Sequence, residues 1–328
     1  MTPLIAKVVV GLPVDGPFDY AIRKDLQGRI QTGQRVRVLF NRQERVGFVV
    51  GFSQRSAFKQ LNPVLDVLDD VAVLDDRALT LAQTFSLYYG CSLGEAIEAY
   101  LPLALRQDKF RATRAGGSFP KAAENSSQKV QITLLHDRGR YDRWPFIIER
   151  IQKAAAQKKN VIVLVPDVFF IEETVAVLAR SLPCPIMVLD KSLTPKKELS
   201  QWEDMKGKEG SVVIGTRSAV FAPLPNVGLI VVDEEDNSSY KQEQTPHYHA
   251  REVAQMCSEI DRCDLIFAGS VPSAEIWEKA KRERWEKVTL GADSPSRMQM
   301  VDMTNYDPRK TSILSFPLQN AMQKTLER

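Results

Sequence analysis

The chain has 328 residues, of which 44% are hydrophobic and 26% are charged. This is the composition of an ordinary globular protein, and the length allows two domains or more. The net charge of +3 permits a nucleic-acid partner but does not require one. No apolar run reaches the roughly 18 residues of a membrane helix, and the N-terminus does not have the tripartite design of a signal peptide. We therefore expect a cytoplasmic protein with no membrane partner.

The beginning of the chain predicts a small β-rich domain, which we assign to residues 1–105. Five short runs are β-branched or alternating and are separated by Gly, Pro and Asp, at residues 7–12, 18–22, 35–40, 45–52 and 63–68. They indicate an antiparallel sheet or a barrel. A helix is expected over residues 76–90, where apolar residues recur at helical spacing.

The pattern changes twice after this domain. Residues 106–129 are basic, contain Gly and Ser and have few large apolar side chains, so they are predicted to be a linker. Over residues 130–297 short apolar strands alternate with helical segments, which predicts a parallel sheet covered by helices. The strands are expected at residues 130–135, 161–165, 185–189, 211–215, 228–232 and 265–269.

Two acids, Asp233 and Glu234, directly follow one of these strands. In a nucleotide-hydrolysing enzyme, acids at this place hold magnesium and orient water. Such an enzyme also needs a glycine-rich loop with Lys and Ser or Thr after its first strand. The stretch at that place, residues 136–146, has one glycine and no Lys-Ser or Lys-Thr pair. Normal ATP binding is therefore not expected, and Arg143 is the candidate for any remaining nucleotide contact.

The residues that commonly bind metals do not form a convincing set. The cysteines are scattered and form no C-x-x-C pair, so neither a zinc site nor a disulfide framework is predicted. His247 and His249 are close in sequence, but two histidines in a loop are a weak signal. No metal ligand is assigned.

Four motifs, GTRSA, DEED, SSYKQ and YHAR, lie between Val212 and Glu252. Together they resemble the helicase core of the PriA family, the primosomal N′ proteins of bacterial replication restart. The resemblance implies that Asp233 and Glu234 are a vestigial Walker B pair. It also implies DNA contacts by Thr216, Arg217, Tyr240, Lys241, Tyr248, His249 and Arg251. The alternative is that this stretch is retained because the strand and its loop pack as a unit.

The N-terminal domain resembles the same family. The runs GPFDYAI, GQRVRVLF and ERVGFVVGF follow one another in the family's order. The resemblance implies that this domain binds DNA and holds a 3′ end in a pocket around Phe18, Asp19 and Tyr20. A carboxylate accepts a hydrogen bond from a free 3′-OH, and aromatic rings offer faces for stacking. The alternative places Phe18 and Tyr20 in the core of the barrel.

Several departures from the family pattern concern the motor. Asp236 replaces the family's His in DEEH, and GSVPSA stands where the family has GSATPS. The family's winged helix is not found between the domains, and residues 298–328 resemble the start of a second RecA-like lobe. We therefore expect an α/β protein in which a small β-rich DNA-binding domain precedes a single RecA-like lobe of the P-loop NTPase type. The second lobe is expected to be absent.

The main hypothesis is a PriA-like DNA-binding protein of replication restart that recognises forked or single-stranded DNA without ATP-driven unwinding. No cofactor is expected, although the family uses ATP and Mg²⁺. DNA is the expected partner, and primosome or single-strand-binding proteins are further candidates. Three alternatives stay open: an adaptor for a separately encoded helicase lobe, a weak ATP-dependent 3′–5′ helicase, and a gene fragment without function.

Overall fold

The computed structural model describes residues 5–112, 130–138, 142–189, 194–291, 300–304 and 314–327. Two compact units are formed, Met1–Gly291 and Ala292–Arg328. The second part of the predicted linker, from residue 113, lies outside the described residues. Within the second unit the structure describes one helix, α8 (Phe316–Leu326). Within the described ranges, no helix is both long enough and apolar enough to cross a membrane.

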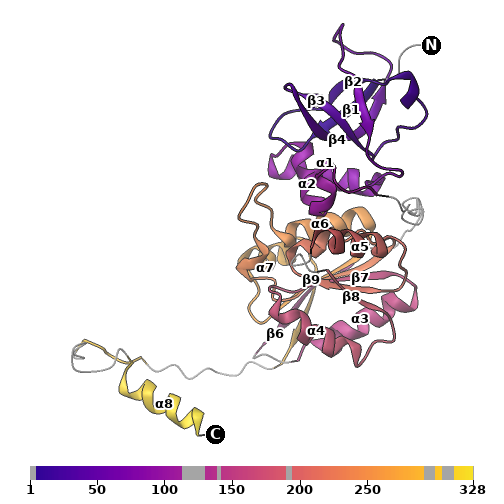
Figure 1. The fold of residues 1–328 in the computed structure, drawn as a ribbon. Helices are drawn as coiled ribbons and strands as arrows, with labels where there is room; N and C mark the ends of the chain where they lie inside the picture. The colour runs from indigo at the N-terminus through magenta and orange to yellow at the C-terminus, as the bar shows by residue number, and fades with distance from the viewer. Residues whose placement is uncertain are drawn as a thin grey trace. The chain divides into compact units, whose positions relative to one another are not determined.

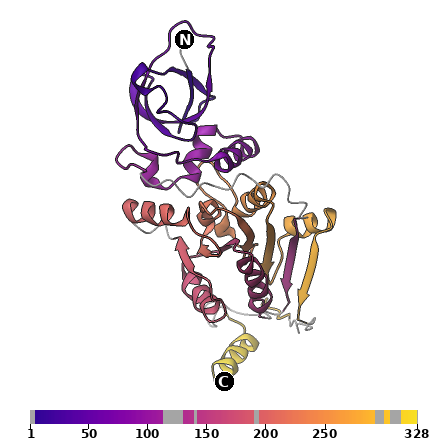
Figure 2. The same cartoon turned by 90° about the vertical axis from the view of Figure 1, so that its right-hand side faces the viewer.

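Five antiparallel strands form the N-terminal sheet, in the order β2-β1-β4-β3-β5. In Figure 2 they curl around a common interior. Alternate side chains of the central strands are buried there, because successive residues of a strand point to opposite faces. The strands are β1 (Ile5–Val10), β2 (Phe18–Ala21), β3 (Arg35–Phe40), β4 (Gln43–Ser53) and β5 (Val64–Val67). All five were predicted.

The β3–β4 hairpin turns through Asn41 and Arg42, both of which have a positive φ. A two-residue hairpin loop of this kind matches the twist of its strands, and Asn tolerates the left-handed region better than most residues. A second close fit involves Gly94, where an added Cβ would lie 1.7 Å from the carbonyl oxygen of Val10. Glycine at this position lets the second helix approach β1.

Two helices connect the barrel to the rest of the first unit. Helix α1 (Asp76–Tyr89) begins where the Asp75 carboxylate accepts a hydrogen bond from Ala78 N, and helix α2 (Leu93–Tyr100) begins with a capping box. Arg77 of α1 donates two hydrogen bonds, of 2.5 and 2.6 Å, to the carboxylate of Asp261 in the following lobe. This ion pair fixes α1 against the lobe.

The lobe contains a seven-stranded parallel sheet in the order β12-β6-β11-β10-β7-β9-β8 (Figure 1). Its strands are β6 (Ile132–Asp137), β7 (Asn160–Leu164), β8 (Ile186–Leu189), β9 (Val212–Gly215), β10 (Val227–Val232), β11 (Asp264–Gly269) and β12 (Glu286–Leu290). Six were predicted. The edge strand β12 was missed, because its sequence EKVTL is short and half polar.

Helices cover both faces of this sheet. On one face lie α3 (Trp144–Ala156) and α4 (Phe169–Ala179), and on the other lie α5 (Pro195–Met205), α6 (Ala250–Asp261) and α7 (Ala274–Arg282). Along β7, Val161 and Val163 pack toward α3 and α4, whereas Ile162 and Leu164 pack toward the opposite layer. The predicted fold class, a β-rich domain followed by a helix-covered parallel lobe, is confirmed.

Candidate functional site

The acids at the end of β10 are paired with an arginine. Arg143, at the N-terminal end of α3, donates to Asp233 at 2.6 Å, to Glu234 at 2.7 Å and to Asp137 at 2.7 Å. Each carboxylate is bound to a different guanidinium nitrogen. Because β6, β10 and α3 all reach this edge of the sheet, residues about 90 positions apart in sequence meet here.

This cluster is largely removed from water. The side chain of Arg143 is 12% exposed, Asp233 is 7% exposed and Asp137 is fully buried. Burial raises the pKa of Asp233, although its hydrogen bond and ion pair with Arg143 act in the opposite direction. The same carboxylates raise the pKa of Arg143 above its ordinary value, so the guanidinium stays charged.

The three carboxylates at this edge of the sheet surround the guanidinium of Arg143, and the predicted lack of magnesium–nucleotide binding stays a prediction. A divalent cation needs carboxylate oxygens that converge on one point, whereas here three carboxylates converge on a guanidinium that is already positive. In the described part of the chain, no group of three His, Cys, Asp or Glu residues is arranged to hold a metal ion. All three guanidinium nitrogens of Arg143 donate to carboxylates, and its predicted nucleotide contact stays a prediction.

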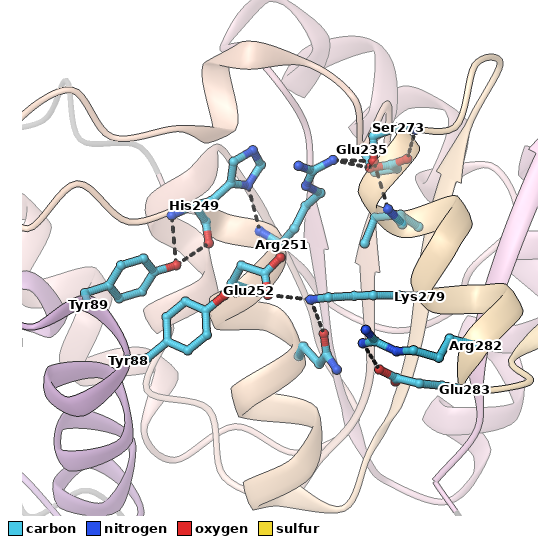
Figure 3. A network of polar contacts seen from close by, with 12 residues as sticks. Tyr88, Tyr89, Glu235, His249, Arg251, Glu252, Ser273, Lys279, Arg282 and Glu283 are labelled. Atoms are coloured by element: carbon cyan, nitrogen blue, oxygen red, sulfur yellow. Dashed lines mark hydrogen bonds and ion pairs between the residues drawn. The ribbon is translucent and has the colours of Figure 1, made fainter.

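Glu235, the third acid of the motif, has a different structural role, which Figure 3 shows. Glu235 is fully buried and accepts from Arg251 at 2.7 Å, from Ser273 N at 2.6 Å and from the Ser273 hydroxyl at 2.8 Å. Ser273 caps α7, and Arg251 lies in the first turn of α6. Glu235 therefore ties the end of β10 to two helices on one face of the sheet.

The same network reaches the N-terminal helices (Figure 3). The Tyr89 hydroxyl of α1 accepts from His249 N at 3.1 Å and donates to the His249 carbonyl oxygen at 3.4 Å. The ring of His249 in turn accepts from Arg251 N at 3.3 Å. Burial and the charge of Arg251 lower the pKa of His249 to about 4, so the ring is neutral at pH 7.

Three of the residues predicted to contact DNA have buried side chains, and their DNA contacts stay predictions. Tyr240 is fully buried and donates to the Asp233 carbonyl oxygen at 2.6 Å. Tyr248 is 4% exposed and packs against Phe85 and Phe221. Arg251 is 8% exposed and is held by Glu235, as described above. The predicted packing of this stretch as a unit accounts for these three residues.

Other predicted residues lie around a polar pocket of about 520 Å³. Thr216 and Arg217 follow β9 and form part of its wall, together with Ser239 and Gln242 from the loop after β10. Arg217 donates to the Ser239 carbonyl oxygen at 2.9 Å. Lys241 is exposed and donates to the His247 carbonyl oxygen at 2.6 Å, and His249 is half-buried at the start of α6.

Of the three predicted 3′-end residues, Phe18 and Tyr20 lie on one face of β2 and Asp19 lies on the other. Tyr20 is 4% exposed and belongs to the barrel core, as the alternative interpretation expected, and its stacking role stays a prediction. Phe18 is partly exposed and packs edge-on against Phe40, with ring centroids 5.0 Å apart. Asp19 pairs with Lys7 at 2.5 Å. Burial acts to raise the pKa of Asp19, but hydrogen bonds from Lys7 and Ser56 outweigh it and lower the pKa. The carboxylate is therefore ionised and can only accept hydrogen bonds.

Comparisons with known proteins agree with this architecture. The family model for the PriA 3′ DNA-binding domain matches residues 7–102, which include the barrel and both connecting helices. The replication restart protein PriA of Treponema pallidum (strain Nichols) is 28% identical over 345 residues, covering 98% of this chain and 52% of that protein. PriA of Bacillus subtilis (strain 168) is 32% identical over 164 residues, covering 50% of this chain and 20% of that protein.

A solved structure, the Hef helicase domain of Pyrococcus furiosus, has 17% sequence identity and a TM-score of 0.36, covering 49% of this chain and 35% of that one. It is too distant to place any residue. The family match covers most of the barrel and both connecting helices, so this part of the chain is similar to a 3′ DNA-binding domain, and the lobe that follows it is a parallel α/β sheet. The chain is related to the N-terminal half of PriA, and it spans about half the length of curated relatives that it matches along nearly its whole length.

Proposed function

We propose that this chain recognises forked or single-stranded DNA at a 3′ end and does not use ATP hydrolysis to unwind it. The match of residues 7–102 to a 3′ DNA-binding domain carries the first part of the proposal. Asp19, held ionised beside Lys7, supplies an acceptor for a terminal hydroxyl group. The half-exposed ring of Phe18 supplies a surface for the terminal base.

The second part of the proposal rests on Arg143. A nucleotide site of the P-loop type places a metal ion between the acids and the phosphates. Here Arg143 neutralises Asp233 and Glu234 from within the fold, and it is held in place by Asp137 as well. The acidic motif is thereby explained as part of the lobe's structure, and the proposal assigns it no catalytic step.

Equilibrium binding to a model fork tests the DNA-binding part. The nascent strand would end in a 3′-OH or a 3′-phosphate, and each fork would be measured at two salt concentrations. We expect tighter binding to the 3′-OH fork, because a phosphate would meet the charge of Asp19. Asp19→Asn should remove this preference, whereas Asp25→Asn, which neutralises an exposed acid paired with Arg23, should keep it. Equal binding of both forks by the wild-type chain would contradict 3′-end recognition.

Steady-state ATP hydrolysis with and without fork DNA tests the other part. We expect no DNA-stimulated activity in the wild-type chain. Activity that appears with DNA and is lost in Glu234→Gln would show that the acids are catalytic. That result would contradict the proposed structural role and restore the weak-helicase alternative.

A further inference from the structure

An exposed apolar run lies at the start of α4. Val168 is 49% exposed, Phe169 is 86% exposed and Phe170 is 43% exposed. Elsewhere in the described residues, no three consecutive positions are large exposed hydrophobic residues, although α8 exposes Phe316, Leu318, Met322 and Leu326 at wider spacing. Three consecutive exposed apolar residues have an unfavourable hydration free energy and indicate a contact surface.

This run continues the wall of the 520 Å³ pocket. Pro166, Asp167 and Val168 line the pocket, and Phe169 is the next residue. Hydrogen bonds fix the turn, since Phe169 N donates to the Asp167 carboxylate at 3.2 Å and Phe170 N donates to the Asp167 carbonyl oxygen at 3.1 Å. These bonds fix the backbone that carries Phe169 and Phe170, directly after the residues of the pocket wall.

The pocket lies where the matched DNA-binding domain meets the lobe. One wall comes from α2, within residues 7–102, and the other follows the adjacent strands β7, β9 and β10. Its walls carry two arginines and three acids, Arg106, Arg217, Glu95, Glu98 and Asp167. Charge alone therefore does not favour phosphate groups here. Hydroxyl and amide groups from Thr216, Ser218, Gln242 and Gln244 instead offer hydrogen bonds to sugars and bases.

We propose that Phe169, supported by Phe170, is a stacking platform for an unpaired DNA base whose strand lies along this pocket. The inference rests on the proposed DNA-binding function and adds a second contact surface to it, on the lobe. Aromatic faces suit any base, so this contact is independent of sequence. It also contributes little to the salt dependence of binding, because it neutralises no phosphate.

The test uses the whole chain and a fork with a single-stranded tail, made either of thymidines or of abasic nucleotides. The abasic tail keeps the phosphates and removes the bases. The wild-type chain should bind the thymidine tail at least about fivefold more tightly, the low end for one stacked base. Phe169→Ala should lose this preference and leave abasic binding unchanged. Leu87→Ala is the matched control, because it truncates another side chain that is 86% exposed.

Each outcome is decisive. Loss of the preference in Phe169→Ala but not in Leu87→Ala supports the stacking platform. A Phe169→Ala variant that keeps the preference overturns it and leaves the fork-binding proposal intact. A wild-type chain that binds neither fork overturns both. Light scattering supplies a further test. If the wild-type chain were a dimer and Phe169→Ala were a monomer, the exposed run would be a protein interface and the DNA assignment would be overturned.

Discussion

Replacement of Arg143 by Met should lower the free energy of unfolding of the lobe. The size of the loss follows from the geometry of the cluster. Methionine keeps much of the apolar volume and removes the charge. It leaves two almost fully buried carboxylates, Asp137 and Asp233, without their common partner. Removal of one partner from a buried ion pair typically costs about 3–5 kcal/mol. We expect a loss in this range at pH 7, measured by urea unfolding followed by circular dichroism.

The loss should depend on pH in a defined direction. Without the guanidinium, the folded-state pKa of Asp233 rises further above its unfolded value, because burial raises it and the opposing effect of Arg143 is lost. Stability of the variant should therefore fall as pH rises from about 4 to 7, and its deficit should shrink at pH 5. The second change Asp233→Asn should restore part of the stability in the Arg143→Met background. Millimolar Mg²⁺ should leave wild-type stability unchanged.

Arg150→Met supplies the control on the same helix. Arg150 makes one longer contact, 3.4 Å to Glu286, and is 24% exposed, so its removal should cost about 1 kcal/mol or less. If Arg143→Met were no more destabilising than Arg150→Met, the cluster would not be the structural element described here. Additive effects of Arg143→Met and Asp233→Asn would likewise refute the pairing.

Three further expectations concern buried polar groups. Burial lowers the pKa of Lys206 to about 8. Lys206→Met should therefore raise the free energy of unfolding by roughly 3 kcal/mol below pH 8. Urea unfolding should show that this gain disappears as pH rises toward 10.5. Wild-type stability should fall as pH drops from 6.5 toward 4, because His249 takes up a proton in the unfolded chain while its ring stays neutral in the folded protein. His249→Asn keeps an acceptor for the helix cap and should flatten this slope, and an unchanged slope would exclude His249 as its cause. Glu235→Gln should lower the free energy of unfolding by about 3 kcal/mol or more, because Arg251 loses its buried carboxylate. A change below about 1 kcal/mol in thermal or urea unfolding would contradict this expectation.

The elements were predictable where local pattern decides structure. Strands such as β7 and β10 are continuous apolar runs, because both of their faces are covered by helices. The barrel strands were recognisable from β-branched residues and from the Gly and Pro that separate them. The edge strand β12 pairs along one side only, so its sequence carries a weaker signal.

The site was predictable only in part, because residue type does not determine burial. Tyr240 and Tyr248 are suited to stacking on bases, yet the loop that carries them folds against α1 and the core. The lack of a Lys-Ser or Lys-Thr pair in residues 136–146 was visible in the sequence, whereas the long-range pairing of Arg143 with the acids was not. Asp137 carried a usable signal, since a charged residue that ends an apolar strand needs a partner.

The first three acids of the DEED motif therefore have structural partners in this fold. Asp233 and Glu234 share an ion pair with Arg143, and Glu235 positions Arg251 and Ser273. Through Arg251 and His249, the hydrogen bonds from Glu235 continue to Tyr89 in the matched DNA-binding domain. The acidic motif therefore has structural contacts that would favour its retention even if the chain hydrolyses no nucleotide, and these contacts link the end of β10 to α1.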